Sequence, residues 1–147
     1  MGAPRAAASK RAEDDTSRVR LRTPDSKTPR DRLDEATAQH GLGAHGRAIE
    51  LLEPLAHGTD TVAAEALWLM AKCHAAENRH HDAIDCLEWA LLETQVHELG
   101  RVALLHDLGL QREALGELDR AADCYAAVRR RAPWFRATQE RLRSLRR

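Results

Sequence analysis

Apolar residues recur along the chain with the periodicity of α-helices. In three segments a leading alanine is followed by apolar residues one, four, seven and eight positions later. The leading residues are Ala48, Ala83 and Ala121. Only Arg129, eight positions after Ala121, departs from this pattern. Offsets of this kind place the side chains on one face of a helix, so each segment is predicted to be a helix with one buried face.

A turn residue and a second small residue precede each of these helices at fixed distances. Five positions before the leading alanines stand residue types that tolerate the left-handed conformation at a helix end. These are Gly43, Asn78 and Gly116. Seven positions further upstream stand small residues, which allow a neighbouring helix to approach closely: Ala36, Ala71 and Gly109. Each unit is therefore predicted to be a helix, a tight turn and a second helix.

The units follow one another at a nearly constant spacing. The leading alanines lie 35 and then 38 residues apart, and the third unit carries the fullest motif. It reads Leu105-x-x-Leu108-Gly109, then Gly116, Ala121-x-x-x-Tyr125, Val128 and Pro133. This pattern resembles the tetratricopeptide repeat (TPR) family, whose period is 34 residues. The resemblance implies an all-α fold in which antiparallel helix pairs stack into a short right-handed superhelix, an α-solenoid of about seven helices.

The pattern also predicts how the chain is divided. Residues 1–27 lack hydrophobic periodicity and are expected to be a disordered tail, and Thr28 is expected to cap the first helix. The repeat domain is expected at 28–147, with units at about 29–59, 60–96 and 97–133 and a capping helix at 134–146. Within the units we expect helices at about 29–41, 45–57, 60–77, 80–94, 97–115 and 118–131. The three extra residues of the second spacing are expected to lengthen the helix that contains Ala90 by about one turn.

The resemblance also assigns a binding surface. In the family, the first helix of each unit presents a stripe of side chains to a concave groove that holds a partner. The matching positions are Leu33, Thr37, Glu65, Trp68, Lys72, His106, Leu110 and Glu113. Trp68 is the most informative of them, because an exposed indole with charged neighbours has the composition of a binding hot spot. The alternative is that the first unit or the N-terminal tail covers Trp68.

Charge is unevenly distributed along the chain. Residues 1–30 carry a net charge of +4, residues 31–128 carry −11 and residues 129–147 carry +7. The basic ends suggest nucleic-acid binding as one alternative. They could also contact the acidic body of the same or a neighbouring molecule, which would allow self-association. No apolar run approaches the ~20 residues that span a bilayer and no secretory signal is evident, so we expect a cytoplasmic protein without a membrane partner.

The residues that could carry chemistry do not form a recognised motif. Cys73-His74 is followed by His80-His81, but this spacing matches no common zinc motif, and His74 and His80 fall where the family packs aromatic rings. We therefore expect neither a metal nor another cofactor, and no enzymatic activity. The sequence favours a non-enzymatic adaptor or scaffold that binds a peptide or partner helix. The alternatives are an accessory nucleic-acid binder and a small TPR chaperone for secreted or assembling partners.

Overall fold

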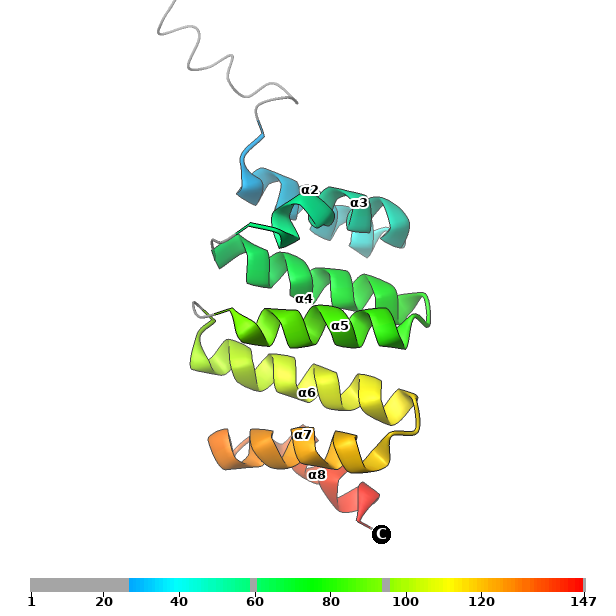
Figure 1. Cartoon of the computed structure of the whole chain (residues 1–147), viewed down its shortest axis with the longest axis vertical. Coiled ribbons are helices and arrows are strands. Elements are labelled where there is room, and N and C mark those ends of the chain that lie inside the picture. The colour runs from blue at the N-terminus through cyan, green and yellow to red at the C-terminus, as the bar shows by residue number, and fades with distance from the viewer. Residues whose placement is uncertain (1–26, 59–60, 94–95, 147) are drawn as a thin grey trace, which may run out of the picture.

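The computed structural model of the chain describes residues 27–58, 61–93 and 96–146. These residues form seven α-helices and no strand, which confirms the all-α fold (Figure 1). The tail predicted at 1–27 lies outside the described residues except for Lys27. The helices are α2 (Pro29–Gly41), α3 (His45–Ala56), α4 (Thr61–Ala76), α5 (His80–Leu92), α6 (Glu98–Ala114), α7 (Leu118–Arg131) and α8 (Arg136–Leu145).

The first helix begins at a capping box. The Thr28 hydroxyl oxygen accepts a hydrogen bond from the backbone N–H of Asp31 at 3.1 Å, and the Asp31 carboxylate accepts one from the Thr28 backbone N–H at 3.2 Å. Pro29 occupies the first helical position, where its missing N–H costs no hydrogen bond. Both interactions satisfy N–H groups that a helix start otherwise leaves without an intrahelical partner.

The three tight turns adopt the left-handed conformation that the sequence pattern requires. Gly43, Asn78 and Gly116 have φ angles of 80°, 62° and 77°. Glycine adopts this region without steric cost, and asparagine is among the few other residue types that tolerate it. The turns fold α2 back on α3, α4 on α5 and α6 on α7.

The repeated small residues lie where helices pack most closely. Ala36, Ala48, Ala83 and Ala121 are fully buried, and Ala71 is nearly so. Gly109 faces the ring of Tyr125, which is itself fully buried. A β-carbon at Gly109 would lie only 2.7 Å from Cδ1 and 2.9 Å from Cζ of that ring. The glycine therefore lets α6 and α7 come together over an aromatic side chain.

The extra residues of the second unit do not lengthen its second helix, so that prediction is wrong. Helix α5 ends at Leu92, and Glu93 has left the helical conformation with ψ at 125°. The Arg101 guanidinium donates hydrogen bonds to the carbonyl oxygens of Leu91 at 3.0 Å and Glu93 at 3.1 Å. These bonds satisfy carbonyl groups at the helix end, and the surplus residues enter the connection to α6.

The last helix covers the end of the stack. Thr138 and Leu142 of α8 are buried, and Phe135 and Leu145 are half-buried. A helical repeat array exposes an apolar face at its end, which a final amphipathic helix must cover. Helix α8 begins at Arg136, two residues later than expected, and leaves Trp134 largely exposed.

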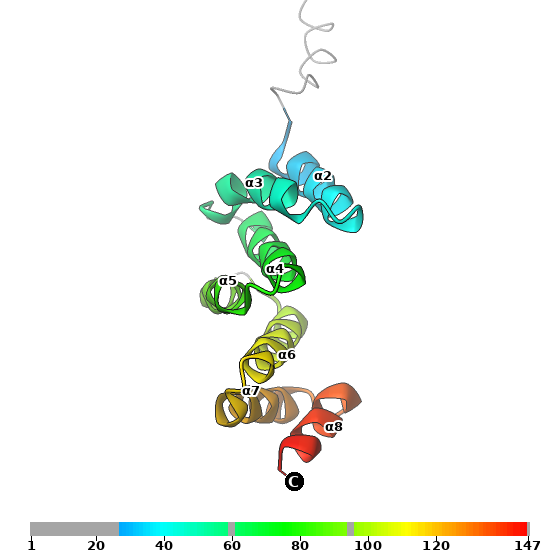
Figure 2. The same ribbon diagram turned by 90° about the vertical axis from the view of Figure 1, so that its right-hand side faces the viewer.

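The helices are distributed over two sides of the stack. Figure 2 shows α2, α4, α6 and α8 along one side and α3, α5 and α7 along the other. The first helices of the pairs therefore share one surface. None of the helices described is both long and apolar enough to cross a membrane.

Candidate binding groove

Trp68 stands at the centre of the surface shared by α2, α4 and α6. Its indole N–H donates a 2.6 Å hydrogen bond to the Asp107 carboxylate of α6. One turn further along α4, the Lys72 ammonium lies 4.4 Å from the centre of the indole ring, within the range of a cation–π contact. The side chain is half-buried, so Trp68 is held in a fixed orientation while part of its ring remains accessible.

An apolar cavity opens on one side of Trp68. Its volume is about 530 Å³, and it lies between the first halves of α4 and α6 and the connection that precedes α6. Its lining residues are Ala64, Glu65, Trp68, Val96, His97, Leu99, Gly100, Ala103 and Leu104. Val96 and His97 come from the segment between α5 and α6. Leu99 is 66% exposed, which leaves a large apolar side chain at the cavity mouth.

A more polar cavity of about 420 Å³ lies on the other side of the Trp68–Asp107 pair. Polar side chains from three helices contribute to its lining: His40, Lys72, Asp107 and Gln111. The Gln111 side-chain oxygen is hydrogen-bonded to His80 Nδ1 at 2.7 Å. The groove thus offers one subsite for an apolar side chain and an adjacent subsite for polar groups.

The α2 end of the groove is charged. Leu33, which the sequence pattern placed on its surface, is buried. Arg30 of α2 pairs with Glu65 of α4 through two hydrogen bonds of 2.8 and 3.1 Å. Thr37 is exposed, but its hydroxyl donates to the Leu33 carbonyl oxygen at 2.8 Å. Leu33 is only 5% exposed because α3 and α4 pack over it. Its assignment to the groove surface is therefore corrected: Leu33 belongs to the core.

The α6 part of the expected stripe lies against the capping helix. His106 Nδ1 is hydrogen-bonded to the buried Thr138 hydroxyl of α8 at 2.7 Å. Burial is the main cause that lowers the pKa of His106. Glu113 accepts hydrogen bonds from the Tyr125 hydroxyl at 2.7 Å and from Arg141 at 3.0 Å.

Leu110 is half-buried beside Tyr125 and Leu142. Together with His106 and Glu113 it contacts the cap, but all three side chains are only half-buried, so their place in the groove stays a prediction. On α6, the polar cavity of the groove extends from Asp107 to Gln111.

The basic ends contact the acidic body of the same molecule. Lys27 pairs with Glu35 at 2.7 Å, and Arg131 pairs with Glu98 at 2.6 Å. In the Arg30–Glu65 and Arg141–Glu113 pairs, too, a basic residue of one end contacts an acidic residue of the body. These partly exposed ion pairs contribute little stability individually, but they neutralise part of the positive charge on which nucleic-acid binding would depend.

The structure does not bring the neighbouring Cys73-His74 and His80-His81 pairs together into one cluster. His80 is engaged with Gln111, and His81 is exposed. His74 is buried, and its Nδ1 has no hydrogen-bond partner within the described part of the chain. Cys73 points instead toward the turn between α2 and α3.

Sequence reasoning missed two features of the groove. Asp107 is adjacent to His106, but the two side chains diverge, one to Trp68 and one to Thr138. Helical spacing could have revealed Asp107, because it lies on α6 toward α4. Val96 lies just before α6 and Leu99 in its first turn, and the periodicity does not specify how the chain enters that helix.

Comparisons with known proteins identify the architecture. Two crystal structures of MamA superpose with TM-scores of 0.69 and 0.72 at 22% sequence identity. They cover 82% and 93% of this chain, which spans 63% and 80% of those proteins. No protein-family model and no curated protein sequence matches the chain.

Two further structures extend the likeness. The TPR domain of Sgt2 from Aspergillus fumigatus has a TM-score of 0.65 at 18% identity, over 84% of this chain and 78% of its own. The second TPR domain of human RPAP3, solved by NMR in complex with the HSP70 peptide SGPTIEEVD, has a TM-score of 0.67 at 18% identity. That alignment covers 82% of this chain and 99% of the RPAP3 domain. The chain therefore has the fold of a tetratricopeptide repeat domain.

Proposed function

We propose that this chain is a non-enzymatic adaptor that binds a peptide segment or helix of a partner protein in the groove between α4 and α6. The observation that carries the proposal is the arrangement around Trp68. A partly accessible indole, fixed by Asp107 and Lys72, stands between an apolar cavity and a polar one. Rigid aromatic side chains beside a pocket are typical of binding hot spots.

The chemistry of the groove defines the kind of segment it fits. A cavity of about 530 Å³ can receive one large apolar side chain, such as leucine or phenylalanine. On the other side of Trp68, the Lys72 ammonium and the Asp107 carboxylate offer hydrogen bonds to backbone or polar side-chain groups of the same segment. We therefore expect a ligand with an apolar anchor followed within a few residues by polar ones.

The fold supports an interaction function of this kind. The RPAP3 domain was solved in complex with a peptide, and its architecture matches that of the chain. In our proposal the groove between α4 and α6 takes a ligand of different chemistry from that peptide. Arg30 is already engaged with Glu65, and Arg141 with Glu113. An acidic peptide such as SGPTIEEVD would have to compete with these carboxylates.

The test is a selection of binding peptides from a random display library against the full chain. Selected peptides are measured by fluorescence polarisation with the wild type and with Trp68→Ala. We expect the substitution to lower affinity by about 2 kcal/mol or more, which is roughly thirtyfold in the dissociation constant. Circular dichroism verifies that the variant remains helical.

The matched control is Trp89→Ala on α5. Trp89 is 53% exposed and lies on the opposite side of the stack, where its ring contacts His57 edge-on. This variant should bind the selected peptides as tightly as the wild type. The proposal fails if no peptide is enriched, or if the enriched peptides bind Trp68→Ala with undiminished affinity.

A further inference from the structure

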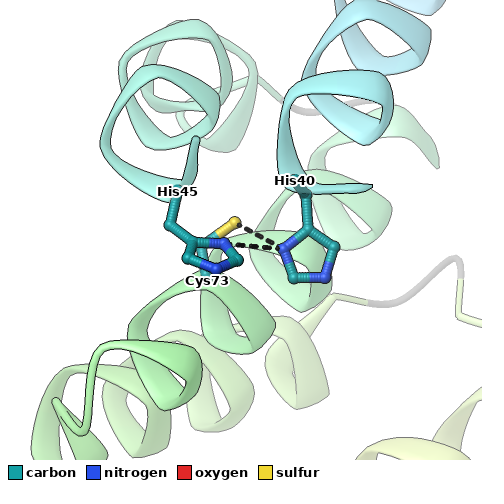
Figure 3. Close-up of side chains that lie close together, drawn as sticks. All are labelled: His40, His45 and Cys73. Carbon is teal, nitrogen blue, oxygen red and sulfur yellow. Dashed lines mark hydrogen bonds between the residues drawn. The ribbon is translucent and has the colours of Figure 1, made fainter. Parts of the chain in front are cut away.

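Three metal-binding side chains converge at the first tight turn. His40 is in the last turn of α2, His45 is the first residue of α3, and the turn that contains Gly43 separates them. Cys73 approaches from α4, 33 residues after His40. Figure 3 shows the two imidazole rings and the thiol directed toward a common point.

The distances among these groups are those of a metal site. His40 Nδ1 lies 3.1 Å from His45 Nδ1 and 3.4 Å from Cys73 Sγ. One ligand atom from each of the three residues lies within 4.8 Å of the other two. Zinc–nitrogen bonds of about 2.0–2.1 Å and zinc–sulfur bonds of about 2.3 Å place tetrahedral ligands roughly 3.3 to 3.6 Å apart. The separations of 3.1 and 3.4 Å from His40 Nδ1 lie close to these values.

Hydrogen bonding alone satisfies the cluster poorly. A neutral imidazole carries one N–H and one acceptor nitrogen. His40 Nδ1 faces both another ring nitrogen and a thiol, which is only a weak donor. If His45 donates through Nδ1, the thiol must share the single lone pair of His40 Nδ1; if His40 donates instead, its one N–H is shared between His45 Nδ1 and the sulfur, a weak acceptor. A cation between the three atoms would engage all of them at once.

Metal binding at this cluster would have to drive the deprotonation of a buried thiol. Cys73 is fully buried, and burial raises the pKa of its thiol to about 11. Burial is also the main cause that lowers the pKa of His40. Imidazole binds metals in its neutral form. The Cys73 proton would be released to solvent as the metal–sulfur bond forms.

We propose that His40, His45 and Cys73 bind one Zn²⁺ ion. Three protein ligands leave a fourth tetrahedral position, which a water molecule would occupy. The site would join the α2–α3 turn to α4, and so fasten the first helix pair to the second. Because the ligands come from three helices, the metal would stabilise the folded state over the unfolded chain. The inference does not depend on peptide binding in the groove.

Cobalt and zinc binding to the untagged full chain tests the proposal. Tetrahedral Co²⁺ with a thiolate ligand gives visible d–d bands and a sulfur-to-metal charge-transfer band in the near ultraviolet. We expect both bands to saturate at one equivalent of Co²⁺ and to disappear on addition of one equivalent of Zn²⁺. Zinc affinity is then measured by competition with a chromophoric chelator.

Two ligand variants and two controls give the assay its specificity. Cys73→Ser should abolish the charge-transfer band. His45→Gln, at a half-buried position, should weaken zinc binding by more than about a hundredfold, beyond the 10- to 100-fold loss typical of residues that only support a ligand. Cys124→Ser and His81→Gln alter residues outside the cluster, so both should bind as the wild type does.

Thermal denaturation adds a second readout, because one equivalent of Zn²⁺ should raise the melting temperature of the wild type but not of His45→Gln. The proposal is overturned by the absence of a charge-transfer band in the wild type. It is equally overturned by zinc binding that persists unchanged in His45→Gln, because that result would place the ion on surface histidines instead.

Discussion

Replacement of Gly109 by alanine probes the closest approach between α6 and α7. The added β-carbon would lie 2.7 and 2.9 Å from two ring carbons of Tyr125 and closer still to Cε1. The ring cannot easily move away, because Tyr125 is fully buried and its hydroxyl donates a 2.7 Å hydrogen bond to Glu113. The two helices must therefore separate, or the ring must leave its preferred position.

The expected destabilisation follows from two opposing effects. Overpacking of a well-packed core costs about 1–3 kcal/mol, and a clash of this severity belongs at the upper end of that range. Alanine is favoured over glycine inside a helix by about 1 kcal/mol. We therefore expect a net loss of about 2 kcal/mol in the free energy of unfolding, or roughly 8 °C in melting temperature for a domain of this size.

Urea denaturation followed by circular dichroism measures this loss. Gly46→Ala in α3 is the matched control, because a β-carbon there meets no atom within 4 Å. This control should be as stable as the wild type or slightly more stable. If Gly109→Ala unfolds at the same urea concentration as the wild type, the described packing of Tyr125 against α6 is incorrect.

Three further substitutions test other parts of the structure. Ala83→Leu should cost about 1–3 kcal/mol, because Ala83 is fully buried, and an unchanged melting temperature would contradict the repeat register. Since the folded-state pKa of His106 is lowered, the unfolded chain binds its proton more readily. Stability should therefore decrease as the pH falls below about 6.5, and His106→Gln should show a shallower decrease in melting temperature between pH 7.5 and 5. Asp107→Ala removes the acceptor of the Trp68 indole N–H and should cost about 1 kcal/mol in urea denaturation; no change would show that the hydrogen bond is not maintained in solution.

The repeat positions explain why so much of the fold was predictable. A left-handed turn residue such as Asn78 and a buried alanine such as Ala83 are local requirements that recur in each unit. Three copies in register therefore specified the number of helices and most of their boundaries. The connection after α5 does not repeat, and there the prediction of a longer helix was wrong.

The groove was only partly predictable, because its surface depends on how neighbouring elements cover it. Periodicity placed Trp68 and Lys72 on one face, and they do contact each other. It could not show that His106 would contact α8, since that contact depends on Thr138, 32 residues later. Leu33 lies on the expected stripe of α2, but α3 and α4 enclose it.

The cluster of His40, His45 and Cys73 illustrates the same limit for chemistry. The sequence directs attention to neighbouring metal-binding residues such as Cys73 and His74. On a helix, however, consecutive residues point in different directions. The three groups come together only because the turn at Gly43 brings α3 back beside α2 over the surface of α4. Such a site follows from the stacking of the helices rather than from a spacing along the chain.

The most direct test of the proposed groove is a ¹H–¹⁵N NMR titration of the chain with a selected peptide. The Trp68 indole N–H gives a resonance that is distinct from those of Trp89 and Trp134. We expect this resonance to shift, together with the amides of α4 and α6 around the two cavities, while the Trp89 and Trp134 indole resonances remain in place. Shifts confined to α3, α5 and α7 or to the arginines at the end of α7, with an unchanged Trp68 resonance, would contradict binding in the groove.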